Sequence, residues 1–171
     1  MNLTQKGHIL GKGYVLAGQQ FVLVLGGANM DISGATERVL VAGDSNPGHI
    51  RCAPGGVARN VAENLARLGN DTRLLTAVGD DLYGRSLLHT TQQTGVDMGG
   101  CWVLADEATS TYVSLHGPDG DMAVAVNDMG ILDRITPERL APHAPQVQQA
   151  NALVVDCNLG ASALEWLFTH R

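Results

Sequence analysis

A run of five apolar residues, FVLVL at positions 21–25, places the strongest limit on what this chain can fold into. The run shows no alternation of apolar and polar residues, so a strand that it forms must be covered on both faces, as the strands of parallel sheets are. Gly26 and Gly27 follow at once and end the strand. The sequence therefore predicts the first strand of a parallel sheet in an α/β fold.

A helix is predicted over residues 54–68, opened by Gly55 and Gly56 and stopped by Gly69. Apolar residues at helical spacing form one stripe along it: Val57, Val61, Leu65 and Leu68. At the angular step of an α-helix, Asn60 and Asn64 lie roughly 60° and 20° from Val57. Both amides are therefore predicted to face inward or to lie at the edge of the buried stripe.

The segments farther along first continue this alternation and then break it. Residues 73–78 resemble a second buried strand and residues 86–94 a second helix, which is the order found in sheets with right-handed crossovers. Short strands without intervening helices then follow, at 101–104, 110–115 and 123–126. We expect these to form a small antiparallel outgrowth with the short strands at 38–42 and 49–53. A helix from Thr136, a strand at 151–155 and a helix at 162–170 return to the α/β order.

Composition excludes several classes of protein. Glycine is frequent, at 21 of 171 residues, without the three-residue period of collagen. The net charge of −6 and the 4% of aromatic residues disfavour a base-stacking nucleic-acid surface. The three cysteines and six histidines are scattered and form no disulfide framework or metal-binding pattern, so we expect no metal site and a reducing, cytoplasmic compartment. No apolar stretch approaches the ~20 residues of a membrane helix.

Candidate binding residues follow the predicted strands, because ligands of open α/β sheets bind beyond the carboxyl ends of their strands. Asn29 and Asp31 come after the first strand and could offer an amide and a carboxylate to a polyhydroxyl ligand. The same residues also fit a plain glycine turn with a solvated acid. At the helix that opens at residue 54, Gly55, Gly56 and Asn60 could let ligand oxygens approach free N–H groups. An ordinary helix start with a satisfied asparagine is the alternative there.

Two further places are open to the same two interpretations. Asp156 and Asn158 follow the strand at 151–155 and are candidates at the sheet edge. The turn at Gly79, Asp80 and Asp81 fits a strand end with a helix cap. Neither a GxGxxG fingerprint nor a GxxxxGK[ST] loop occurs in the sequence.

Three motifs in this order resemble the PfkB/ribokinase family of sugar and nucleoside kinases. The G-x-x-N-x-D motif spans residues 26–31, the GG-x-x-x-N-x-A helix that runs on to L-x-x-L-G spans 55–69, and T-x-V-G-x-D-x-x-G spans 76–84. The resemblance covers residues 21–171. It implies a ribokinase-like parallel-sheet core with a small antiparallel β lid built from about 38–53 and 101–127. Within the family, the stretches at 43–48, 54–60 and 127–129 are most similar to pseudouridine kinases. Val57 and Ala58 stand where ribokinases have a lysine-containing GGKGxN stretch, which disfavours free ribose.

The resemblance implies transfer of the γ-phosphoryl group of ATP, with Mg²⁺, to the 5′-hydroxyl of a nucleoside. The similarity to pseudouridine kinases implies that this nucleoside is pseudouridine. Whether a monovalent cation is also required is left open. By motif, Asp31 and Asn60 are expected to hold ribose hydroxyls, with Gly55 and Gly56 letting the sugar approach and Asn29 assisting. The lid is expected to close over the nucleoside and, in this family, to support a homodimer. Base-reading candidates on the lid side are Ser45, Asn46, Thr111 and Asn127.

The family's catalytic base lies in a later D-T-x-G-A-G-D motif, which does not occur in these residues. We therefore expect no catalytic residue here, an amino-terminal half with an incomplete sheet, and little or no kinase activity from this polypeptide. Residues 1–20, which carry Lys6 and Lys12 and no acid, resemble the end and wing of a winged helix-turn-helix, although a plain hairpin also fits. DNA binding would need the complete module upstream. Alternatives are another PfkB sugar or nucleoside kinase (ribose, adenosine), a nucleoside-sensing DNA-binding regulator and a truncated product that only dimerises.

Overall fold

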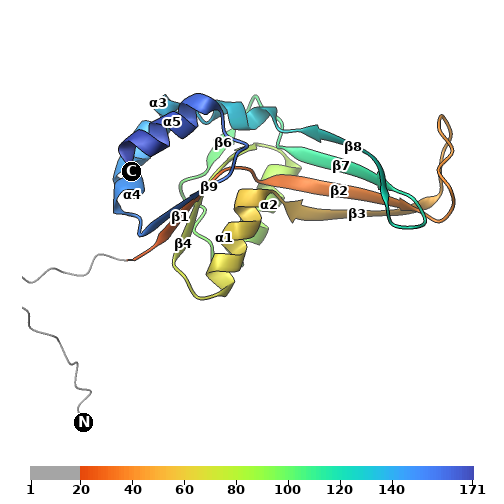
Figure 1. Ribbon diagram of the computed structural model, residues 1–171, viewed down its shortest axis with the longest axis horizontal. Helices are drawn as coiled ribbons and strands as arrows, with labels where there is room; N and C mark the ends of the chain where they lie inside the picture. Colours follow the sequence, from red (N-terminus) through yellow and green to blue (C-terminus); the bar gives the residue numbers. More distant parts are fainter. Residues whose placement is uncertain (1–19) are drawn as a thin grey trace, which may run out of the picture.

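A computed structural model describes residues 20–171 of the chain as an α/β body from which a β-sheet arm projects (Figure 1). The prediction for residues 1–20 lies, apart from its last residue, outside the described part. The body is built on a parallel sheet with the order β4-β1-β9. β1 (Val22–Leu25) lies between β4 (Thr72–Leu75) and β9 (Ala152–Val155).

Helices cover both faces of β1, as its uninterrupted apolar sequence predicts. Leu23 and Leu25 pack in one core with α3 (Pro137–Leu140), α4 (Ala144–Gln149) and α5 (Ala161–His170). Val24 points the other way and packs on α1 (Val57–Arg67). The side chains of Leu23, Val24 and Leu25 are all fully buried. The expected parallel-sheet core is confirmed, and so are the helix start at Thr136, the strand near 151–155 and the helix near 162–170.

The second buried strand differs from the prediction. Residues 73–78 do not form one strand, because the chain leaves the main sheet at Thr76. β4 ends before it, and β5 (Ala77–Gly79) pairs instead with β6 (Trp102–Leu104) in a small parallel sheet. Segment 101–104 therefore belongs to the body, and its expected place in the lid is wrong. The 3-10 helices at Gly130–Arg134 and Ala141–His143 complete this side of the body.

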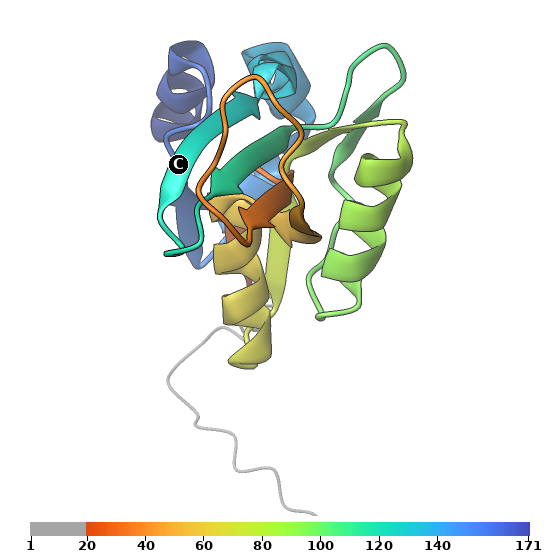
Figure 2. The ribbon, with the colours of Figure 1, turned by 90° about the vertical axis from the view of Figure 1, so that its right-hand side faces the viewer.

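The projecting arm is a four-stranded sheet with the order β3-β2-β7-β8, called the lid below. It consists of β2 (Asn29–Thr36), β3 (Gly48–Gly55), β7 (Thr111–His116) and β8 (Met122–Asp128). β2 pairs in parallel with β7, so the lid is mixed rather than purely antiparallel. The strand expected at 38–42 is wrong, since residues 37–47 form the loop at the tip of the lid, which faces the viewer in Figure 2.

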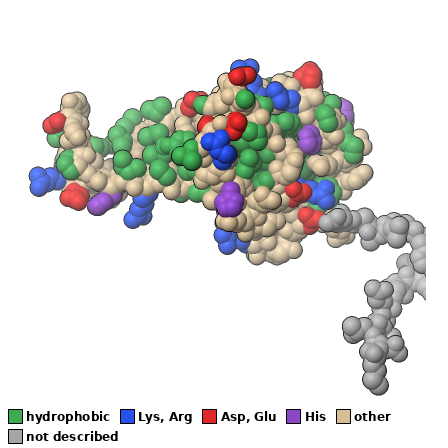
Figure 3. All heavy atoms as spheres, turned by 180° about the vertical axis from the view of Figure 1, so that it is seen from behind, with side chains coloured by type: hydrophobic (Ala, Val, Ile, Leu, Met, Phe, Trp, Pro, Cys, Tyr) green, Lys and Arg blue, Asp and Glu red, His purple; other side chains and the backbone are tan. Residues whose placement is uncertain are grey.

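The two faces of the lid differ in chemistry. Register places Asp31 opposite Tyr112, and Tyr112 opposite Asn127, so these three polar residues share one face. The other face is apolar, and α2 (Leu82–Gln92) covers its near end around Ile32. Its far end is exposed, as the hydrophobic side chains along the arm in Figure 3 show. The exposed residues on it include Ile50, Val113, Leu115, Val124 and Val126.

α1 buries a different stripe from the one that the sequence favours. Ala58 and Ala62 face the sheet, whereas Val57 and Leu68 are 58% and 80% exposed. The helix is rotated so that small side chains face β1, which allows close packing. Asn60 and Asn64 are both exposed, and Asn64 donates from its side chain to the Asn60 carbonyl oxygen, so neither amide faces the core. Within residues 20–171, no helix is long and apolar enough to cross a membrane.

Gly56 connects the lid to α1, and its replacement should damage the fold. Its φ of +98° disfavours any side chain, and an added Cβ would lie 2.4 Å from the Gly27 carbonyl oxygen. Gly56→Ala is expected to lower the free energy of unfolding by about 3 kcal/mol. Urea denaturation followed by circular dichroism measures this.

Gly69→Ala is the matched control, because Gly69 also has a positive φ, of +87°, but nothing lies within 4 Å of its added Cβ. Only the backbone cost of about 1 kcal/mol is expected there. Equal losses in the two variants would show that the contact with Gly27 is unimportant.

Candidate functional site

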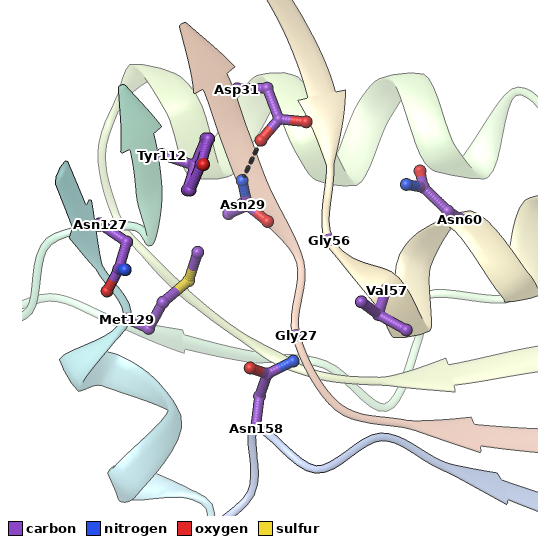
Figure 4. A pocket seen from close by; sticks show the side chains of 10 residues that line it. All are labelled: Gly27, Asn29, Asp31, Gly56, Val57, Asn60, Tyr112, Asn127, Met129 and Asn158. Atoms are coloured by element: carbon purple, nitrogen blue, oxygen red, sulfur yellow. Dashed lines mark hydrogen bonds between the residues drawn. The ribbon is translucent and has the colours of Figure 1, made fainter. Parts of the chain in front are cut away.

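A cleft of about 550 Å³ lies where the body meets the lid. It begins at the carboxyl end of β1, passes the start of α1 and is flanked by lid strands (Figure 4). Its lining consists of Gly27, Asn29, Asp31, Gly56, Val57, Asn60, Tyr112, Asn127, Met129 and Asn158. Six residues predicted from the sequence are thus brought together: Asn29, Asp31, Gly56, Asn60, Asn127 and Asn158.

The polar groups of the cleft are one carboxylate, several carboxamides and a phenol. Asn29, at the start of β2, donates from Nδ2 to Oδ1 of Asp31 at 2.5 Å. Tyr112 on β7 lies beside Asp31, and Asn127 on β8 lies beside Tyr112 on the same face of the lid. Carboxamides both donate and accept hydrogen bonds, and a carboxylate only accepts. The cleft can therefore bind a neutral ligand that carries several hydroxyl groups.

The two positions that precede α1, Gly55 and Gly56, require glycine for different structural reasons. A Cβ on Gly55 would lie 2.1 Å from Oδ2 of Asp31, so the missing side chain leaves room for that carboxylate. Gly56 lies against the backbone of Gly27 and Ala28 and lines the cleft. Gly55 does not line it. The sequence predicts that a ligand approaches Gly55 directly, whereas in the structure Gly55 makes room for the Asp31 side chain.

The carboxylate of Asp156 accepts hydrogen bonds from backbone groups of the protein. Oδ2 accepts hydrogen bonds from the backbone N–H groups of Gly27 and Ala58, at 2.9 and 3.1 Å, and Oδ1 accepts from the N–H of Asn158 at 2.9 Å. The residue is 9% exposed and does not line the cleft. Because the N–H of Arg59 also bonds to the Gly27 carbonyl oxygen, the amides of Ala58 and Arg59 in the first turn of α1 are occupied rather than free for a ligand.

The remaining lid candidates lie away from the cleft lining. Ser45 and Asn46 belong to the 37–47 loop, where the Asn46 amide bonds to both backbone groups of Val41. Thr111 pairs with Met30 on the opposite face of the lid from Tyr112. Tyr112, Met129 and Val57 were not predicted as cleft residues, and Gly27 was predicted only as part of the G-x-x-N-x-D motif. The alternation of side chains along a strand would have selected Tyr112 in place of Thr111 once the face of Asp31 was known.

The glycine-acid turn after β5 is a helix cap. Oδ1 of Asp81 accepts from the N–H of Gly84 at 2.7 Å and from the Thr109 hydroxyl, and Oδ2 accepts from the Thr109 N–H. Burial raises the pKa of this carboxyl, but these hydrogen bonds outweigh it and hold the pKa below its usual value. The cap ties the start of α2 to the segment that leads into β7.

The described part of the chain contains three free thiols and no cluster of metal-binding side chains. No group of three or more His, Cys, Asp or Glu side chains in residues 20–171 could hold a metal ion. Cys52, Cys101 and Cys157 are free thiols. Burial raises the pKa of Cys101 to about 12, so it remains protonated.

Comparison with known proteins decides the family. The profile described as "pfkB family carbohydrate kinase" matches residues 19–168. The chain belongs to the PfkB family of carbohydrate kinases. Pseudouridine kinase of Escherichia coli is 48% identical over 149 residues, which cover 87% of this chain and 48% of that protein. An uncharacterized sugar kinase of E. coli, YeiI, is 44% identical over 99% of this chain and 47% of its own length.

Solved structures agree on the fold. A carbohydrate kinase from Agrobacterium tumefaciens matches with a TM-score of 0.81 and 32% identity, over 88% of this chain and 50% of that one. Arabidopsis thaliana ribokinase matches with a TM-score of 0.77 and 20% identity, over 88% and 51%. This PfkB chain therefore has a ribokinase-like fold, and it spans about half the length of these relatives.

Replacing Asp156 should loosen the cleft of this PfkB chain. In Asp156→Asn the side-chain nitrogen would face at least one backbone N–H, so a buried donor would lose its acceptor. We expect the free energy of unfolding to fall by about 2 kcal/mol. Asp80→Asn is the control, because Asp80 is 56% exposed and forms a surface ion pair with Arg85. There we expect a change within about 0.5 kcal/mol in urea denaturation. Equal effects of the two substitutions would contradict the role of Asp156.

Proposed function

We propose that this chain forms the nucleoside-binding half of an ATP-dependent kinase that converts pseudouridine to pseudouridine 5′-phosphate. The cleft between body and lid supports this most directly, since its single carboxylate and its carboxamides suit a neutral polyol. The 48% identity to E. coli pseudouridine kinase supports the choice of nucleoside. Similarity to a guanosine-inosine kinase, at 26%, and to a fructokinase, at 37%, makes other nucleosides and sugars the alternatives to test.

The cleft residues would bind and orient the sugar. Asp31 would accept a hydrogen bond from a ribose hydroxyl, and Asn29 and Asn60 would complete the contacts of the diol. Gly56 would allow the sugar to lie close to the start of α1. Tyr112 and Asn127, which replace Ser45, Asn46 and Thr111 as the stronger lid candidates, would contact the nucleoside from β7 and β8. Holding the hydroxyl in place and excluding water are the contributions that phosphoryl transfer requires of such a site.

ATP and Mg²⁺ are proposed for the whole enzyme. The Arabidopsis ribokinase of similar fold was solved with ribose and ATP. Mg²⁺ would neutralise phosphate charge during transfer. The described residues hold no cluster of metal-ligating side chains, so they do not fit a resident Mg²⁺ site. The contribution proposed for this chain is to bind the acceptor nucleoside.

Nucleoside binding tests the proposal directly. By isothermal titration calorimetry, the 171-residue chain should bind pseudouridine more tightly than uridine, adenosine, ribose or fructose. Asp31→Asn should weaken this binding about tenfold, because a hydrogen bond to a charged group is lost. The free energy of unfolding should change little, because an asparagine at position 31 can still accept the hydrogen bond from Nδ2 of Asn29. Asp44→Asn is the control, because Asp44 lies in the exposed loop at the tip of the lid, where its Oδ1 accepts from the N–H of Ser45.

Two results would contradict parts of this proposal. Tighter binding of adenosine or a hexose would reject pseudouridine while leaving the family unchanged, and equal affinity of Asp31→Asn would remove Asp31 from the site. Because the D-T-x-G-A-G-D motif is not among these residues, we also propose that the 171-residue chain binds without turnover. Pseudouridine-dependent ADP release from a preparation free of host kinase would contradict that.

The exposed apolar face of the lid is proposed to bind a second copy of the chain. Ile50 and Val126 on it are 76% and 68% exposed, which is costly for a monomer in water. Light scattering should give the mass of a dimer for the chain and of a monomer for Val126→Asp. Phe168→Asp is the control, because Phe168 is 71% exposed on α5, away from the lid. A dimer that persists in Val126→Asp would argue against this face.

Residues 1–20 are proposed as the end of a winged helix-turn-helix and residues 21–171 as kinase domain. The family profile begins at residue 19, which supports the boundary. Similarity to YeiI runs over 169 residues, against 149 for E. coli pseudouridine kinase. This difference supports a segment shared with YeiI ahead of the kinase domain. DNA binding is proposed only for a chain that carries the whole winged module.

A further inference from the structure

Arg59 is a buried charged residue next to the cleft. It lies on α1 immediately before Asn60 and is 6% exposed. Arginine is rarely buried without a reason, because removing its charge from water is costly unless its donors are paired. None of the sequence motifs described above assigns a role to Arg59.

The guanidinium of Arg59 is held on three sides. Nη2 lies 2.6 Å from Oε2 of Glu63, one turn farther along α1. Nη1 donates to the Thr91 hydroxyl of α2 at 3.5 Å. Nη2 and Nε both donate to Oδ1 of Asn60, at 2.7 and 3.2 Å. The arginine therefore has a fixed position from which it contacts a residue of the cleft.

This contact fixes the orientation of the Asn60 amide. A guanidinium donates hydrogen bonds and cannot accept one, so Asn60 must turn its oxygen toward Arg59. The amide nitrogen then faces the cleft, on the side of Asp31 in Figure 4. Glu63 remains charged beside Arg59, since the hydrogen bond from Arg67 and then that from Arg59 lower its pKa against the opposing effect of burial. The ion pair thus keeps the guanidinium in place.

We propose that Arg59 is a positioning residue that makes Asn60 a hydrogen-bond donor to the bound ligand. The ligand atom at this point must then be a hydrogen-bond acceptor, such as a sugar hydroxyl oxygen. This proposal rests on the proposed function for the identity of the ligand. The orientation of the free amide is independent of that identity.

Arg59→Met tests the proposal, because methionine fills a similar volume without donors. We expect pseudouridine affinity to fall about fivefold to tenfold in the 171-residue chain. In the background of Asn60→Ala, the same change should alter affinity less than twofold. A purely structural role of Arg59 predicts equal losses in both backgrounds, and that result would overturn the proposal.

Two further variants separate orientation from loss of an ion pair. Arg67→Met is the control, since Arg67 also pairs with Glu63, at 2.7 Å, but is 62% exposed and is not among the donors to Asn60. It should leave affinity unchanged. Asn60→Asp keeps an acceptor for Arg59 and has a similar shape, but its carboxylate cannot donate. It should weaken binding at least as much as Arg59→Met, and retained affinity would contradict the donor role.

NMR of the free chain tests the orientation without any ligand. Nuclear Overhauser effects from the Asn60 side-chain NH₂ protons should reach Gly56 or Val57 in the native chain and in Arg67→Met. They should be lost or redistributed in Arg59→Met. An unchanged pattern in Arg59→Met overturns the proposal even if no nucleoside binds. Failure to bind pseudouridine with the expected pattern intact would instead reject the proposed function alone.

Discussion

The carboxylate of Asp156 holds together the three segments that meet at the base of the cleft. It lies beyond the end of β9 and accepts from Gly27, which follows β1, and from Ala58 in the first turn of α1. Two backbone donors that the strand end and the helix start would otherwise leave unpaired are thus satisfied by one buried side chain. The third acceptor contact, from the N–H of Asn158, fixes the turn that carries another cleft residue. Gly26 has no side chain because a Cβ there would lie 2.3 Å from this carboxylate.

The body forms one wall of the cleft, and the pairing register of the lid strands determines which side chains form the other wall. β2 leaves the body close to Gly27, so the position of Asn29 and Asp31 follows from the same turn. Parallel pairing of β2 with β7 then sets Tyr112 beside Asp31, and antiparallel pairing of β7 with β8 sets Asn127 beside Tyr112. A slip of one residue would turn these side chains to the apolar face. The lid therefore has one polar face toward the cleft and one apolar face whose far end is exposed.

The sequence predicted the parts of this arrangement that depend on local pattern. The run FVLVL predicted a strand covered on both faces. The glycine-rich start of α1 could be predicted because glycine is needed where backbones approach closely. β2 was missed because NMDISGAT contains few strand-forming residues and is ordered by its neighbours β3 and β7. The buried stripe of α1 was misassigned because alanines, rather than the larger valine and leucine, face the sheet. The role of Asp156 and the selection of Tyr112 depend on contacts and pairings between distant segments, which single-sequence periodicity does not contain.

Orientation matters more than charge in a cleft lined by carboxamides. An amide offers a donor on one side and an acceptor on the other, so it contributes specificity only if something fixes which side faces the ligand. In two cases a charged neighbour does this. Asp31 accepts from Nδ2 of Asn29, which leaves the Asn29 oxygen for other partners, and Arg59 donates to Oδ1 of Asn60, which leaves the Asn60 nitrogen. One charge of each sign thus gives the cleft one defined acceptor and one defined donor. A hydroxyl group, which both donates and accepts, is the group that uses such a pair fully.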